Sequence, residues 1–181
     1  GAVTIQPKGT ILRSTDGGQT WTLLTSNQPE TYTSVWFVNS TTGFVTASPA
    51  GGGDDVLLRT DNGGQSWSVV ALPAHSSGRP IIGLVSSHFA DAQNGWVVGT
   101  AGQENGGMAN EPVALHTTDG GQTWVHEPGY QGAGGAFFDV WAVNAELAFF
   151  VGDSGKITRW TKGGFVLPDG GTAEGVVVGE D

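Results

Sequence analysis

The sequence contains no cysteine and few basic side chains. Its 181 residues include seven Lys and Arg against seventeen Asp and Glu, which gives a net charge of −10. Binding to a nucleic-acid backbone or to an anionic membrane requires a basic stripe, and this chain cannot assemble a large one. Without cysteine there is no disulfide, and no stretch approaches the roughly 20 apolar residues of a membrane helix. We therefore expect neither a nucleic-acid partner nor membrane insertion.

Glycine and tryptophan, in contrast, are abundant, with 31 and 7 residues respectively. This composition indicates many tight turns between short strands whose aromatic side chains fill a core. A nine-residue segment recurs without gaps as Arg13–Trp21, Arg59–Trp67 and His116–Trp124, and Arg159–Phe165 is an eroded fourth copy. The copies begin 46, 57 and 43 residues apart, a spacing typical of one four-stranded propeller blade.

Each copy belongs to a longer repeated unit. Upstream of it lie a strand, a polar turn and a second strand rich in aromatic and β-branched residues, and no helical period of useful length is found. The sequence predicts a single all-β domain or propeller segment over residues 1–181, with about four blades. The expected units are 31–72, 80–127 and 136–168, with a partial unit at 1–25 and an extra strand at 175–178.

Two forms of the ring are open. Val176–Val178 could complete the partial first unit and close a small ring, which would remove exposed sheet edges. Alternatively, the chain is part of a six- to eight-bladed ring completed by further sequence or by a second chain. Gly175–Gly179 resembles Gly95–Gly99, a second strand of the unit, and this favours the larger ring or complex.

The repeated segment, Ser/Thr-x-Asp-x-Gly-x-Thr-Trp, resembles the Asp-box, or bacterial neuraminidase repeat. With its flanking strands the sequence is most similar to the propellers of the photosystem II stability and assembly factor family, while sialidases and sortilin-type receptors carry the same box. The resemblance implies boxes on the rim of the ring, away from the ligand face. It also implies a non-catalytic assembly or scaffold protein that works outside the cytoplasm (periplasmic, secreted or cell-surface) and binds a protein partner.

The box residues have a structural interpretation that requires no function. A short Asp or Asn side chain accepts hydrogen bonds from the N–H groups of a tight turn, and glycines adopt the positive φ angles that the turn requires. The tryptophans can wedge between strands or between adjacent blades. The residues assigned to this role are Asp16, Asn62 and Asp119 with Trp21, Trp67 and Trp124.

Four basic residues at one repeat position are the predicted binding residues: Arg13, Arg59, His116 and Arg159. They could form an arc that docks a carboxylate-bearing segment of a protein, and the assembly-factor family is known for an arginine patch. Alternatively, each pairs with a carboxylate of its own or a neighbouring blade and holds the turn.

Two long loops, Pro49–Asp55 and Thr100–Pro112, follow equivalent strands and are expected on one face. Their side chains would make this face acidic, and we expect a solvated surface there rather than a calcium site. The residues concerned are Asp54, Asp55, Glu104, Asn105, Asn110 and Glu111.

We expect no catalytic residues, no metal and no cofactor. A sialidase-like site needs a tyrosine nucleophile and an arginine triad, but only Tyr32 and Tyr130 are present and three of the four arginines belong to the boxes. His75, His88, His116 and His126 lack metal-ligand spacing. A carbohydrate-binding or glycoside hydrolase propeller is the alternative, because exposed tryptophans stack on sugars. Burial of Trp36, Trp96, Trp141 and Trp160 would remove that platform.

Overall fold

The structure, a computed structural model, describes residues 9–28, 30–102, 110–127 and 135–166. Their strands form four antiparallel sheets. Sheet 1 contains β1 (Gly9–Arg13) and β2 (Thr22–Gln28), and sheet 2 contains β3 (Glu30–Phe37), β4 (Gly43–Pro49), β5 (Val56–Thr60) and β6 (Ser68–Val70). Sheet 3 contains β7 (Ile81–Phe89), β8 (Gly95–Ala101), β9 (Glu111–Thr117) and β10 (Val125–His126). Sheet 4 contains β11 (Phe137–Asn144), β12 (Leu147–Gly152), β13 (Ile157–Thr161) and β14 (Gly164–Val166), with a single 3₁₀ turn at Asp153–Gly155.

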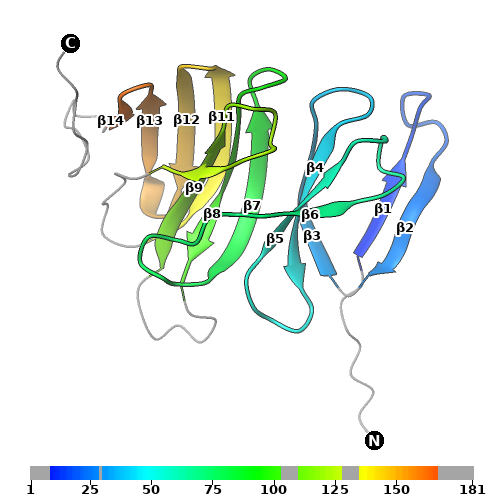
Figure 1. Cartoon of the computed structure of the whole chain (residues 1–181), viewed down its shortest axis with the longest axis horizontal. Coiled ribbons are helices and arrows are strands. Elements are labelled where there is room, and N and C mark those ends of the chain that lie inside the picture. The colour runs from blue at the N-terminus through cyan, green and yellow to red at the C-terminus, as the bar shows by residue number, and fades with distance from the viewer. Residues whose placement is uncertain (1–8, 29, 103–109, 128–134, 167–181) are drawn as a thin grey trace, which may run out of the picture.

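The sheets stand side by side in chain order, with sheet 1 at one end of the molecule and sheet 4 at the other (Figure 1). In sheets 2, 3 and 4 the strands follow one another as a meander, which is the arrangement of a propeller blade. The predicted all-β propeller of four-stranded blades is confirmed. Sheet 1 differs because β1 pairs with β2 alone, and no other described strand lies at its second edge.

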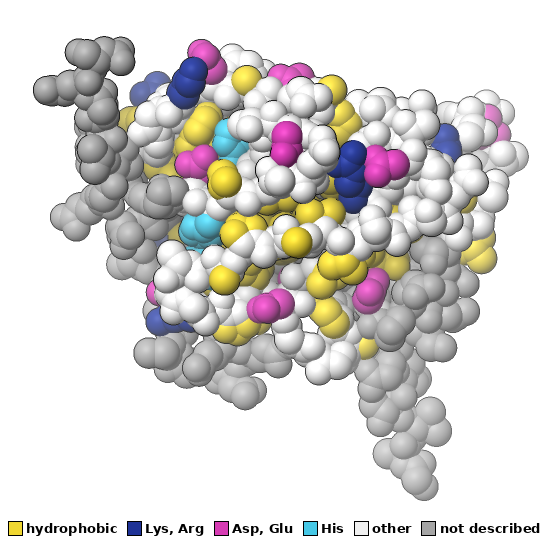
Figure 2. Space-filling view, in the orientation of Figure 1, with side chains coloured by type: hydrophobic (Ala, Val, Ile, Leu, Met, Phe, Trp, Pro, Cys, Tyr) yellow, Lys and Arg dark blue, Asp and Glu magenta, His cyan; other side chains and the backbone are white. Residues whose placement is uncertain are grey.

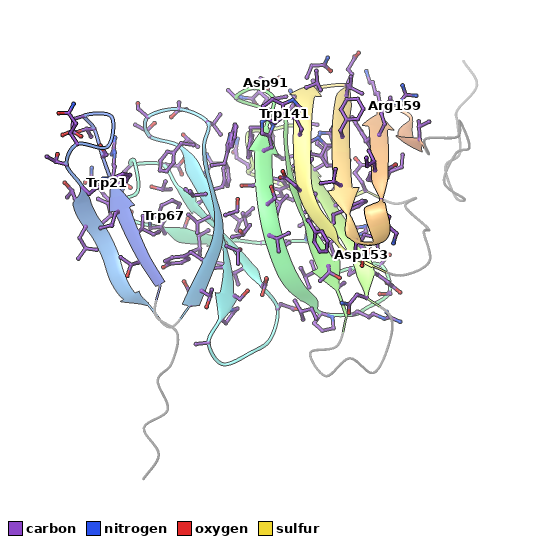
Figure 3. The ribbon with its side chains drawn as sticks, turned by 180° about the vertical axis from the view of Figure 1, so that it is seen from behind. Trp21, Trp67, Asp91, Trp141, Asp153 and Arg159 are labelled. Carbon is purple, nitrogen blue, oxygen red and sulfur yellow. The ribbon has the colours of Figure 1, made fainter. Side chains whose placement is uncertain are left out.

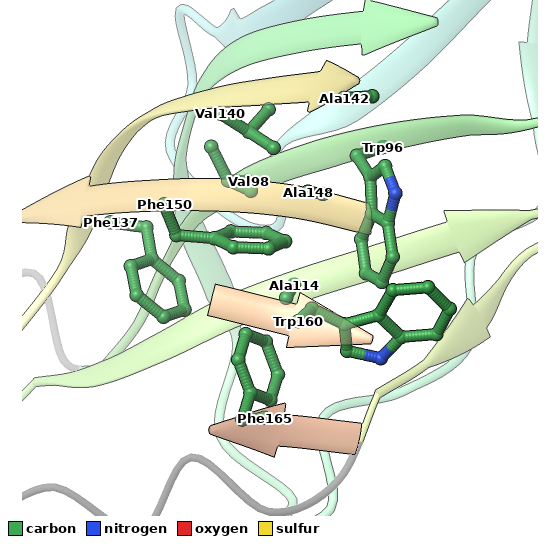
Figure 4. Close-up of a cluster of buried hydrophobic side chains, with 10 residues drawn as sticks. All are labelled: Trp96, Val98, Ala114, Phe137, Val140, Ala142, Ala148, Phe150, Trp160 and Phe165. Atoms are coloured by element: carbon green, nitrogen blue, oxygen red, sulfur yellow. The ribbon is translucent and has the colours of Figure 1, made fainter. Parts of the chain in front are cut away.

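The hydrophobic core lies between the sheets. Strand side chains alternate between two faces, and in the middle sheets both faces are covered, so both sets are apolar. Between sheets 3 and 4, Trp96 and Val98 pack against Val140, Phe150 and Trp160 (Figure 4). Between sheets 2 and 3 the cluster includes Phe44, Leu57, Leu84, Phe89, Leu115 and Trp124. A smaller cluster, Val45, Ala47 and Leu58, meets Ile11 and Tyr32 beside sheet 1.

The strand expected at 175–178 lies outside the described residues, so its part in closing the ring stays a prediction. Among the described residues, no helix is long and apolar enough to cross a membrane.

Candidate binding site

The three Asp-box turns are held by side-chain hydrogen bonds between the same positions. In the first, Asp16 accepts from the backbone N–H of Thr20 at 2.9 Å and from its hydroxyl at 2.6 Å, while Ser14 Oγ accepts from the N–H of Gly18 at 2.7 Å. Asp119 makes the same two contacts with Thr123, at 2.9 and 2.6 Å. Asp119 and Asp16 are therefore bound within their own turns.

Asn62 shows that the turn does not depend on charge. Its Oδ1 accepts from the N–H of Ser66 at 2.9 Å, and its Nδ2 donates to the Ser66 hydroxyl at 2.8 Å. In the other two boxes the threonine bonds stabilise the ionised carboxylate. Hydrogen bonds from Thr123 lower the pKa of Asp119 to about 2, and bonds from Thr20 lower the pKa of Asp16 further.

The glycine pair of each box adopts positive φ, as in Gly120 at 72° and Gly121 at 77°. The second glycine also provides room for the preceding sheet. A Cβ on Gly121 would overlap the ring of Phe44, and a Cβ on Gly64 would lie 2.8 Å from Leu24 Cδ1. In the first box, by contrast, a Cβ on Gly18 would meet only its own Trp21.

The box tryptophans differ in exposure. Trp124 is buried and meets Phe44 and Phe89 edge to face, at 6.0 and 5.9 Å between ring centroids. Trp67 packs with the small cluster beside sheet 1. Trp21 is 60% exposed, and no described sheet precedes sheet 1 to cover it, so its place between blades stays a prediction. Figure 3 shows Trp21 at one end of the molecule.

The arginines at the predicted docking position join neighbouring sheets. Arg13 Nη1 donates to the carbonyl oxygen of Gly63 at 2.9 Å, and Arg59 Nη1 donates to that of Gly120 at 2.8 Å. Arg59 also forms an ion pair with Asp61 at 2.8 Å. Each guanidinium thus reaches from its own strand to the box of the next sheet. Lys and Arg side chains do not gather into a patch on the face in Figure 2.

The other two residues at this repeat position, His116 and Arg159, differ from Arg13 and Arg59 and from each other. His116 is buried, stacks on Trp96 at 4.1 Å between ring centroids, and lies 3.2 Å from Glu127. Trp160 of the next sheet covers it at 5.0 Å. Arg159 is exposed on sheet 4. The structure therefore does not bring these four residues together as one open arc, and a docking role for them stays a prediction.

The loop face is less solvated than expected. Asp55 is buried and accepts from the N–H of Leu84 at 2.7 Å, so its expected place on a solvated surface is wrong. Asp54 accepts from the N–H of Ile81 at 3.0 Å. Both carboxylates bind backbone of the next sheet. Glu104 and Asn105 lie outside the described residues.

A histidine pair next to this face was not predicted as a unit. The rings of His75 and His126 meet edge to face at 4.6 Å, and Glu111 lies 3.3 Å from His75 and 3.2 Å from Arg79. Burial, and then the neighbouring His75, lower the pKa of His126 to about 4. In the described part of the chain, no group of three or more acidic or histidine side chains could hold a metal ion.

A ladder of rings joins the first strands of sheets 2, 3 and 4. His88 lies between Trp36 at 4.3 Å and Trp141 at 4.4 Å, and its Nδ1 accepts from the N–H of Ala142 at 3.1 Å. The three rings share one repeat position, a signal present in the sequence. Trp96 and Trp160 are buried, but Trp141 is 62% exposed, so a stacking surface remains.

A groove of about 650 Å³ lies between sheet 1 and the first strand of sheet 2. We call it the β1 groove, because residues of β1 form one side. Ile11 and Leu12 line that side, and Tyr32, Val35 and Phe37 line the other. Val35 is 59% exposed and Ile11 is half-buried, so apolar surface is accessible on both walls. Arg13, Thr33, Ser34, Asn39 and Ser40 supply polar atoms.

Comparisons with known proteins agree with this geometry. The family model of the BNR/Asp-box repeat matches residues 12–23, the first box. The fold is similar to "YCF48 bound to D1 peptide", with a TM-score of 0.57, 23% identity, and coverage of 92% of this chain and 44% of that one. It is also similar to YCF48 from Cyanidioschyzon merolae, with a TM-score of 0.51, 20% identity, and coverage of 75% and 35%.

The chain has the fold of a β-propeller and carries the Asp-box repeat. Both solved structures are less than 25% identical to this chain, so the likeness concerns the fold. The Asp-box propeller spans less than half the length of the solved structures that it matches. No curated protein sequence matches it.

Proposed function

We propose that this Asp-box propeller is a non-catalytic binding protein that takes an extended segment of a protein partner into the β1 groove. The observation that supports this is the second edge of β1, which pairs with no other described strand, beside two apolar walls. A sheet edge offers a row of unpaired backbone groups to a peptide, and pockets for alternate side chains then give specificity. The groove combines both features.

The side chains of the groove indicate the chemistry of the segment. Apolar residues on one face of an added strand would contact Ile11, Val35 and Phe37. Arg13 has one described hydrogen bond, to Gly63, while a guanidinium has five N–H donors. Its remaining donors suit a carboxylate in the bound segment, which is the partner chemistry expected from the sequence.

The likeness to a peptide-bound YCF48 supports a protein partner but concerns the fold alone. Peptide recognition by this chain, its role in assembly and its extracytoplasmic location are parts of the proposal, and the location rests only on the resemblance of the sequence. Fractionation of the source cells, followed by immunodetection of this protein in each fraction, tests the location.

The binding test uses the purified chain and an array of extended peptides, with the strongest peptide then titrated by fluorescence anisotropy. We expect Val35→Glu to weaken its binding by about tenfold or more, because it places a charge against an apolar wall. Val69→Glu is the matched control, since Val69 is a 67% exposed strand valine on β6, outside the groove. No peptide bound by the array, or equal loss in both variants, would refute the proposal.

Exposed Trp141 favours a second candidate function, carbohydrate binding. Glycan-array binding that is lost in Trp141→Ala and kept in Val35→Glu would support this function over peptide binding. A panel of fluorogenic glycosides tests the absence of catalysis, and we expect no turnover.

A further inference from the structure

The contact between sheets 2 and 3 shows what an Asp box requires from the sheet before it. Arg59 donates to the carbonyl oxygen of Gly120, and the ring of Phe44 covers Gly121 and meets Trp124 at 6.0 Å. Phe44 is the cross-strand partner of Arg59. One face thus presents an arginine and a phenylalanine, and the other presents two glycines and a tryptophan.

Sheet 4 presents the arginine and the phenylalanine of such a contact, but no described Asp box faces them. Arg159 occupies the position of Arg59, and its cross-strand partner is Phe149, which is 41% exposed. Ile157, at the position of the fully buried Leu57, is 60% exposed. Val151 and Trp141 are exposed too. We call this surface the Arg159 face.

Sheet 1 presents the two glycines and the tryptophan of an Asp box, but no described arginine and phenylalanine face them. A Cβ added to Gly17 would contact no neighbouring atom, and a Cβ added to Gly18 would contact only Trp21. Trp21 itself is 60% exposed. Leu12, at the position of the buried Leu115, is 51% exposed. Arg159 and Trp21 lie at opposite ends of the molecule (Figure 3), so these two surfaces do not meet within one copy.

We propose that the Arg159 face of one molecule binds the first Asp box of a second copy, with Arg159 donating to the carbonyl oxygen of Gly17 and Phe149 covering Gly18 and Trp21. The two surfaces differ, so each copy uses both, and the contact closes only if the copies form a ring. The described residues of two copies supply eight sheets, and known propellers contain four to eight blades. The product is a dimeric ring.

The contact uses the face of sheet 1 rather than the edge of β1. A dimer is therefore compatible with the β1 groove but does not depend on it.

The first test is the mass of the purified full chain in solution, measured by light scattering and sedimentation. We expect a dimer that Arg159→Glu weakens by about tenfold or more in its dissociation constant, as for loss of a charged hydrogen bond. Lys162→Glu is the control, because it makes the same change of charge at a nearby exposed turn. A monomer at tens of micromolar, or a dimer equally sensitive to both changes, would overturn the proposal.

The second test locates the contact and exploits the absence of cysteine. Ile157→Cys and Leu12→Cys molecules are mixed and treated with a short bis-maleimide, leaving Arg159, Phe149 and Trp21 in place. We expect efficient heterodimer cross-linking, as the equivalent Leu57 and Leu115 share one cluster. Val69→Cys, exposed to a similar degree, replaces Leu12→Cys as the control. Equal cross-linking by both pairs would contradict this interface.

Discussion

Arg59 reaches across a sheet boundary and donates from Nη1 to the carbonyl oxygen of Gly120, 2.8 Å away. The same side chain is held by Asp61 and lies 5.6 Å over the ring of Phe44. The bond satisfies a carbonyl of the next box turn, and Arg13 makes the same contact with Gly63. The Asp boxes are thus joints between sheets as well as turns within them.

Arg59→Ala should destabilise the fold, since it removes this bond and leaves the Gly120 carbonyl without its donor. We expect a loss of about 1.5–3 kcal/mol, typical of a hydrogen bond from a charged group. The measurement is urea unfolding followed by tryptophan fluorescence. Lys162→Ala, which removes a charge from an exposed turn, should change stability by less than about 0.5 kcal/mol.

Gly121→Ala should cost more than its backbone strain alone. The residue has φ 77° and its added methyl would overlap Phe44. Gly155 has φ 72°, and a methyl added there would meet no neighbouring atom, so Gly155→Ala measures the strain by itself. We expect about 1 kcal/mol for Gly155→Ala and at least about 1 kcal/mol more for Gly121→Ala, from overpacking. Equal losses would show that Phe44 moves aside freely.

The repeat was sufficient to predict the strands and the turn chemistry, because both depend on neighbours within about ten residues along the chain. Contacts between sheets were harder to predict. Arg59 and Gly120, or His88 and Trp141, are more than fifty residues apart, and only the relative rotation of two sheets decides which side chains meet. The shared repeat position of Trp36, His88 and Trp141 was the available signal. The second edge of β1, which pairs with no other described strand, had no sequence signal beyond the partial first unit.

Asp119→Asn should be tolerated, whereas Asp119→Ala should not. Asn62 already makes the equivalent contacts with Ser66 in the second box. We expect less than about 1 kcal/mol for the asparagine and about 1–3 kcal/mol for the alanine, which leaves the N–H of Thr123 without its acceptor. Thermal unfolding of both variants measures the difference. Similar losses would mean that the charge, and not the acceptor, holds the turn.

Acid should weaken the fold in two separate ranges of pH. The pKa of Asp119 is about 2 in the folded chain, below its ordinary value of 3.8, so its contribution is present above pH 4 and is lost below it. Protonation of His126 weakens the fold in a higher range of pH. Its folded pKa of about 4 lies below the ordinary 6.5, so protonation favours the unfolded chain. Stability should therefore fall as the pH falls from about 6.5 towards 4.

His126→Gln should flatten the upper of these two ranges. Burial is the main cause of the low pKa of His126, the facing His75 adds to it, and Glu127 and Glu111 oppose it. Glutamine cannot take up the proton, so urea midpoints between pH 7.5 and 4.5 should change less in the variant than in the parent chain. Some slope should remain, because burial also lowers the pKa of His88. An unchanged slope in His126→Gln would assign the acid sensitivity to other groups and refute this account.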